Sequence, residues 1–118
     1  MRGLVFAALA LIGCTDDTVS HDTSFRRLVD AYPTFEDCVA ATPFEVCYQT
    51  LTLCPDGVAL LDLENHLEDG KYKVEASIAK MTFVSRTVLF DLDRASSPQL
   101  PGAHPWESND PVFTGCAP

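Results

Sequence analysis

The sequence predicts a small, mainly β protein. We expect an antiparallel β-meander, forming a curved sheet or small barrel, with one or two short N-terminal helices and disulfide staples. From residue 44 to residue 92, apolar and polar side chains alternate with the period of two that strands show. Short turn sequences interrupt this alternation, so consecutive strands should pair antiparallel. The chain has 118 residues and five cysteines, enough for one small domain that needs covalent support.

Two helices are expected before the strands. The segment 23–31 carries apolar residues at helical spacing, namely Phe25, Leu28 and Val29. A second helix should begin at Thr34, where Asp37 completes a pattern similar to a capping box, and Pro43 ends it. Helices this short most often cover one end or face of a sheet.

Four or five strands should follow these helices. Alternation and composition favour strands over 46–53, 58–63, 71–83 and 88–92. A tight turn at Pro55-Asp56-Gly57 joins the first two, because Gly57 tolerates positive φ. An acidic bend over 64–70 precedes the third. The alternation is clearest over 71–78, which should have one buried and one solvated face.

The tail from about residue 94 to the end should be irregular and lie on the surface. It contains five prolines, which oppose regular helix and sheet: Pro98, Pro101, Pro105, Pro111 and Pro118. The single tryptophan, Trp106, lies in this tail. We expect it to seal an open edge of the core, the alternative being an exposed binding anchor.

Four cysteines are candidates for disulfides once Cys14 is set aside: Cys38, Cys47, Cys54 and Cys116. Four cysteines allow three pairings, and sequence does not choose among them. We favour Cys38 with Cys47, which closes a helix-to-strand connection, and Cys54 with Cys116, which attaches the C-terminus to a strand end. A zinc site is the alternative, but the spacing contains no C-x-x-C pair. No metal site is predicted.

The N-terminus has the layout of an export signal. Arg2 is followed by an apolar run to Ile12, then by Gly13 and Cys14. Leu11-Ile12-Gly13-Cys14 resembles the lipobox of bacterial lipoproteins. The resemblance implies that residues 1–13 are a cleaved signal peptide and that Cys14 is the lipidated first residue of the mature chain. Residues 14–22 should then form a flexible tether to a single domain over 23–118.

The same resemblance indicates a location. In lipoproteins an Asp directly after the lipidated cysteine tends to retain the protein in the inner membrane, and here that position holds Thr15. The chain is therefore expected in the cell envelope, at the periplasmic or surface face of the outer membrane rather than the inner membrane. An apolar run of about ten residues is too short to span a bilayer.

The charge of the chain narrows the choice of partners. Its formal net charge is −9, and loss of the signal peptide, which carries Arg2 and no acid, makes it more negative. Such a chain is repelled by phosphate backbones and by anionic headgroups. We therefore expect no nucleic-acid partner, and we expect membrane attachment to come from lipid on Cys14 rather than from a basic face.

No catalytic residues or cofactors are predicted. The serines lack a G-x-S-x-G elbow, and the cysteines lack a C-x-x-C redox pair. The acidic residues around His66, over 62–70, could in principle bind calcium, but they lack the order of an EF-hand loop, so a solvated turn is favoured.

The expected function is that of a non-catalytic, membrane-anchored envelope lipoprotein. It would act as a binding or structural module for an envelope protein or a cell-wall component. The alternative is an inhibitor of an exported basic hydrolase such as a lysozyme. A protruding acidic loop at 64–70 would favour the inhibitor, and an enclosed apolar cavity would favour a ligand carrier.

Overall fold

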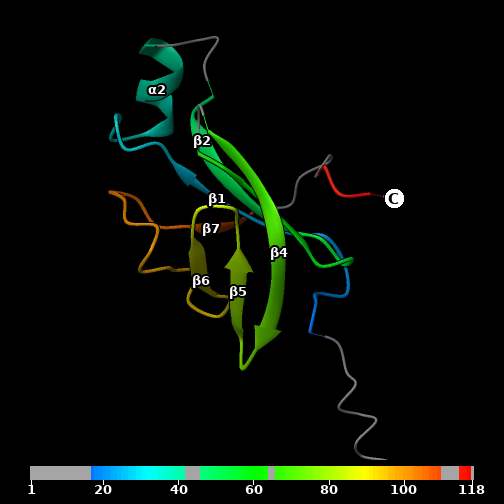
Figure 1. The fold of residues 1–118 in the computed structure, drawn as a ribbon. Coiled ribbons are helices and arrows are strands. Elements are labelled where there is room, and N and C mark those ends of the chain that lie inside the picture. The colour runs from blue at the N-terminus through cyan, green and yellow to red at the C-terminus, as the bar shows by residue number, and fades with distance from the viewer. Residues whose placement is uncertain (1–16, 42–45, 64–65, 110–114, 118) are drawn as a thin grey trace, which may run out of the picture.

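Seven antiparallel strands form one curled sheet, a half-barrel, in the computed structural model (Figure 1). The structure describes residues 17–41, 46–63, 66–109 and 115–117. The predicted fold class, mainly β with disulfide staples, is confirmed. The elements of the described residues are β1 (Thr23–Leu28), α2 (Phe35–Ala41), β2 (Tyr48–Leu53), β3 (Val58–Asp62), β4 (Leu67–Glu75), β5 (Ile78–Thr82), β6 (Thr87–Asp91) and β7 (Glu107–Asn109).

The strand order is β6-β5-β4-β3-β2-β1-β7, so the first six strands form a meander. A long connection then leads from β6 at one edge of the sheet to β7 at the other, where β7 pairs with β1. Curling brings the two edges together through side chains. The ring of Phe90 on β6 lies 4.8 Å from that of Phe25 on β1 and 5.9 Å from that of Trp106 beside β7.

The inward-facing side chains fill the half-barrel. The core cluster contains Phe25, Leu51, Leu53, Ala59, Leu61, Tyr72, Ala79, Met81, Phe83, Val88, Phe90, Leu100 and Trp106. Burial of these apolar groups is the main force that holds the sheet in its curled form. Trp106 is buried within this cluster, so it seals the open side of the half-barrel as expected.

The expected helix over 23–31 is wrong. Residues Thr23–Leu28 form β1, which pairs with β2 on one side and β7 on the other. Phe25 and Arg27 are both buried, which is the period of a strand. Backbone pairing on both sides outweighs the weak helical spacing of the apolar residues. The second helix is confirmed as α2, where the Asp37 N–H donates to Thr34 Oγ1 at 3.1 Å, an N-cap.

The expected strand over 71–83 is two strands. Ala76 and Ser77 have φ of 52° and 68°, and they form a two-residue turn between β4 and β5. Such hairpin turns need positive φ at both central residues and usually show Asn or Gly there. Neither is present, so the sequence did not reveal the turn. β4 also begins earlier than expected, at Leu67, and takes in much of the predicted acidic bend.

The tail is less irregular than predicted. Residues Glu107–Asn109 form β7, so part of the tail extends the sheet. The segment before it is fastened by the guanidinium of Arg27, which donates to the Leu100 carbonyl at 2.7 Å and lies over the Trp106 ring. Prolines on either side of β7 leave its short run of three residues uninterrupted. Pro111 and Pro118 lie outside the described residues.

Both predicted disulfides are confirmed. Cys38–Cys47 ties α2 to the chain just before β2, and with Val29 it forms a second, smaller apolar cluster. Cys54–Cys116 joins the end of β2 to the C-terminal segment across 62 positions of sequence. On the chain-entropy model the longer loop stabilises more, by about 4 kcal/mol against about 3 kcal/mol.

Candidate functional site

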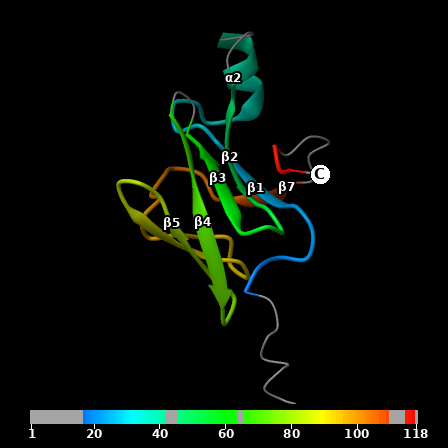
Figure 2. The same ribbon diagram turned by 45° about the vertical axis from the view of Figure 1, so that its right-hand side comes forward.

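Strand β4 positions the surfaces that are candidates for function. It has nine residues, from Leu67 to Glu75, and spans about 27 Å at the usual rise of a strand. Its carboxyl end lies where the described chain begins, and α2 lies at the opposite end of the molecule (Figures 1 and 2). The two halves of β4 therefore present different surfaces to different surroundings.

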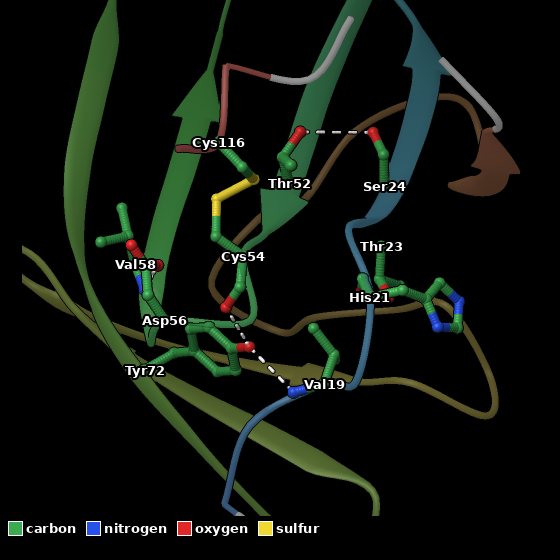
Figure 3. Close-up of a disulfide and its surroundings, with 10 residues drawn as sticks. All are labelled: Val19, His21, Thr23, Ser24, Thr52, Cys54, Asp56, Val58, Tyr72 and Cys116. Atoms are coloured by element: carbon green, nitrogen blue, oxygen red, sulfur yellow. Dashed lines mark hydrogen bonds between the residues drawn. A yellow bond between two sulfur atoms is a disulfide. The ribbon is translucent and has the colours of Figure 1, made fainter. Parts of the chain in front are cut away.

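The described chain begins by packing against the carboxyl half of β4. The Val74 N–H donates to the Asp17 carbonyl at 2.6 Å. Two residues further on, the Val19 N–H donates to the Tyr72 hydroxyl at 3.0 Å, and that hydroxyl donates to the Cys54 carbonyl at 2.7 Å (Figure 3). One phenol thus links the N-terminal segment to the end of β2, next to the Cys54–Cys116 disulfide.

Burial raises the pKa of the Tyr72 hydroxyl above its ordinary value of 10.0. The Val19 N–H opposes this shift by favouring the phenolate, and the nearby Asp56 carboxylate adds to it. Tyr72 is therefore neutral over the physiological range, able both to donate and to accept. It serves as a structural link, not as an acid or base.

The segment 17–22 differs from the flexible tether expected over 14–22. Asp17 is hydrogen-bonded to β4, and Val19 is partly buried against the core. The described part of this segment is therefore attached to the domain. Cys14 lies outside the described residues.

A basic surface lies on the outer side of β4 and β5. Lys71, Lys73 and Lys80, which we call the lysine face, are the only lysines in the sequence, and all three are exposed. Lys73 is paired directly opposite Lys80, and Lys71 opposite Thr82. These side chains line a shallow depression of about 270 Å³. These three exposed lysines therefore lie together on one side of a chain whose net charge is negative.

The lysine face has no charge partner within the part of the chain that the structure describes. The ion pairs there join other residues, and none includes a lysine. Like charges directly opposite each other in an antiparallel pair are destabilising. Lys73 and Lys80 are therefore not explained by their contribution to the fold.

A cleft lies at the other end of β4. It has a volume of about 320 Å³ and lies between the start of β4 and the turn that joins β5 to β6. Two aliphatic side chains beside the cleft are exposed to solvent: Leu67 is 69% exposed and Val84 is 102% exposed. We call this the β4 cleft, with lining residues His66, Leu67, Glu68, Asp69, Val84 and Ser85.

The acidic residues near the β4 cleft are partly neutralised within the fold. Arg86 Nη2 donates to Glu68 Oε2 at 2.6 Å, and His66 Nε2 lies 3.2 Å from the same oxygen. The Glu68 side chain is only 10% exposed. The expectation of a solvated acidic turn is wrong for 67–70, because these residues are strand and Glu68 is ion-paired. Residues 64 and 65 lie outside the described part.

Sequence reasoning missed both surfaces. Lys71 and Lys73 are visible in the sequence as alternating lysines, but the position of Lys80 opposite Lys73 depends on the unrecognised turn at Ala76-Ser77. The β4 cleft depends on the approach of the β5–β6 turn to β4. Within the described residues, no three His, Cys, Asp or Glu side chains are grouped so that they could bind a metal ion together.

Comparison with known proteins adds no relative. No family model matches the chain, and no curated protein or solved structure gives a significant match. The class is therefore defined by architecture alone: a small, disulfide-stapled, antiparallel half-barrel. No helix within the described ranges has the length and apolar character needed to cross a membrane.

Proposed function

We propose that this chain is a non-catalytic envelope lipoprotein, anchored through lipid on Cys14, whose half-barrel acts as a binding module. The lipobox resemblance at 11–14 is the first support. The stable, disulfide-bonded domain that follows is typical of proteins exported to an oxidising compartment.

The pairing of the other cysteines is the observation that carries the proposal. The chain has five cysteines, and four of them pair with one another in two disulfides. Cys14 is the one that remains, so it has no intramolecular thiol to pair with. An unpaired cysteine in an exported protein needs another explanation, and lipidation at a lipobox supplies one.

The proposed anchor would hold one end of the domain close to the membrane. Cys14 is three residues before Asp17, which is hydrogen-bonded to β4. Three residues reach at most about 11 Å. The carboxyl end of β4 would then face the membrane, and the β4 cleft would face away from it. Its exposed Leu67 and Val84 offer an apolar contact to an envelope protein.

The inhibitor alternative receives less support from this geometry. It calls for an ordered acidic loop that reaches outward, whereas Glu68 is bound by Arg86 and lies within strand β4. We therefore keep the proposal to a binding module.

The anchor is tested by labelling cells with radioactive palmitate and separating their membranes. The wild-type chain should incorporate label and sediment with membranes. Cys14→Ala should lose the label and the membrane association, while Thr15→Ala, the matched control, should keep both. A Cys14→Ala chain that remained equally membrane-bound would refute the proposal.

The proposed outer-membrane location has its own test. Thr15→Asp should shift the labelled protein toward the inner-membrane fraction, because Asp after the lipidated cysteine favours retention there. An unchanged distribution between the two membranes would remove the support that Thr15 lends to the outer membrane.

A further inference from the structure

We propose that the lysine face binds the phosphates of anionic lipids in the leaflet that holds the Cys14 anchor, and so sets the orientation of the domain on the membrane. This inference rests on the proposed function, since it needs the anchor. It goes beyond that function because it assigns a lipid-binding surface to Lys71, Lys73 and Lys80.

The first argument is position. Asp17 is hydrogen-bonded to Val74, which follows Lys73 in β4 and is paired with Ala79, the neighbour of Lys80. Asp17, the described residue nearest in sequence to Cys14, therefore lies beside the lysine face. With at most about 11 Å of chain between Asp17 and Cys14, this end of the domain stays near the headgroups.

The second argument is the distribution of charge. The sequence contains eight basic and seventeen acidic residues, yet all three lysines lie on one surface. Three arginines are engaged by other groups: Arg26 pairs with Glu107 at the surface, Arg86 pairs with Glu68, and Arg27 is buried. Of the described lysines and arginines, those outside these interactions are the three lysines and the exposed Arg94, whose segment lies beside Ser77 at the same end of the sheet.

The third argument is the loss of folding stability that two opposed lysines cause. Lys73 opposite Lys80 weakens the β4–β5 pair. A phosphate between two ammonium groups would relieve that repulsion. Lysine suits this role because its ammonium is a compact charge on a flexible stem.

The acidic groups near the patch limit its strength. Asp69 and Glu75 lie on the same side of β4 as Lys71 and Lys73, one beyond each end, and Asp17 lies beside Val74. Three lysines in this setting bind weakly and in a salt-dependent way. The anchor raises their effective concentration at the surface, so weak contacts suffice to orient the domain.

The experiment uses the full exported chain, purified from membranes and reconstituted into vesicles. One set of vesicles contains phosphatidylcholine alone, and the other has a third of it replaced by phosphatidylglycerol. Acylation of each lysine by a water-soluble reagent is followed by mass spectrometry. Labelling of the three lysines should be roughly fivefold slower on the anionic vesicles, and high salt should abolish the difference.

Two single-charge variants provide the matched comparison. Lys73→Gln should reduce the protection of Lys71 and Lys80 on anionic vesicles. Arg26→Gln removes the same charge from the sheet row that contains Leu67, at the end of β4 away from the proposed anchor, and should leave that protection unchanged. Equal protection in the two variants would contradict a specific role for this surface.

Flotation of the same vesicles separates the two proposals. Protein that floats with phosphatidylcholine alone but shows equal lysine labelling on both lipids would overturn the lysine inference and leave the anchor intact. Flotation with anionic vesicles only would refute the anchor, and with it the anchored orientation that the inference assigns to the lysine face. Failure to float with either would overturn both.

Discussion

The two halves of strand β4 differ in whether their charged side chains are ion-paired within the fold or exposed to solvent. In the amino half, the Glu68 carboxylate is nearly buried and is held by Arg86, so its charge is used inside the fold. In the carboxyl half, Lys71 and Lys73 are exposed and, within the described residues, lack an acidic partner. On the inward side of the carboxyl half, the Tyr72 hydroxyl has its hydrogen-bond partners, since it donates to the Cys54 carbonyl and accepts from the Val19 N–H.

This difference separates structural charges from charges available to a partner. A carboxylate removed from water needs a cation beside it, and truncating either member is costly. Solvated lysines placed opposite each other lower stability instead. Substitution of Glu68 should therefore lower stability, whereas substitutions on the lysine face should change binding while leaving stability nearly the same or higher.

The largest effect is expected at Gly70, between the two halves. A Cβ there would collide with the Thr82 carbonyl oxygen and would lie 2.8 Å from Phe83 Cδ1. Gly70→Ala should therefore lower the free energy of unfolding by about 2–3 kcal/mol, measured by urea denaturation. Lys71→Thr, on the solvated side of the same strand, should change it by about 0.5 kcal/mol or less. Equal stability of the two variants would contradict the close contact of Phe83 with β4.

Tyr72→Phe should lower stability by about 2 kcal/mol, because the Val19 N–H and Cys54 carbonyl lose their partner. It should also change the pH dependence. The pKa of Tyr72 is raised in the folded chain, so the unfolded chain releases the phenol proton first, and stability falls as pH rises above about 10. Denaturation curves at increasing pH should show a shallower fall for Tyr72→Phe. An identical slope in both proteins would argue against a buried phenol.

Glu68→Gln should lower stability by about 1 kcal/mol, because it removes the charge that Arg86 binds. The effect is moderate since the Arg86 side chain is 34% exposed and water can replace part of the interaction. Asp69→Asn, at the neighbouring exposed position, is the control and should have little effect in the same thermal melt. A larger loss in the control would reverse the assignment of the structural charge.

Lys73→Glu should raise stability by about 0.2–1 kcal/mol, because it turns a repulsive cross-strand pair with Lys80 into an attractive one. The gain should shrink in high salt. The same variant should lose lysine protection on anionic vesicles, so stability and lipid contact should change in opposite directions. A stability loss would show that Lys73 contributes to the fold in a way that the cross-strand register does not explain.

The smallest effect on stability is expected at Val84. Its side chain is fully exposed, so Val84→Asp should change the free energy of unfolding by about 0.5 kcal/mol or less. Binding of an envelope partner at the β4 cleft should nevertheless be lost. The measurement is crosslinking by a photoreactive amino acid incorporated in place of Ser85, which adds no cysteine to the chain. Retained crosslinking would move the partner away from the cleft.

Local patterns were sufficient for much of the fold. The N-cap at Thr34, the alternation in β2 and β3, and the turn at Gly57 each depend on neighbours in sequence, so they could be predicted. The order of these elements favoured one of the three disulfide pairings, and the structure has that pairing. Longer-range features could not be predicted: β1 is a strand because β2 and β7 flank it, and β7 exists because β1 offers it an edge.

By itself, the sequence determined that the chain is mainly β, that four cysteines can pair, and that its N-terminus resembles a lipobox, since each depends on residue type and short spacing. Only the tertiary structure decided which charges meet. Strand register places Lys80 opposite Lys73, and chain reversal brings Arg86 to Glu68 and Asp17 to Val74. The physical reason is that electrostatic and hydrogen-bonding interactions act across a few ångströms of space, whatever the separation in sequence.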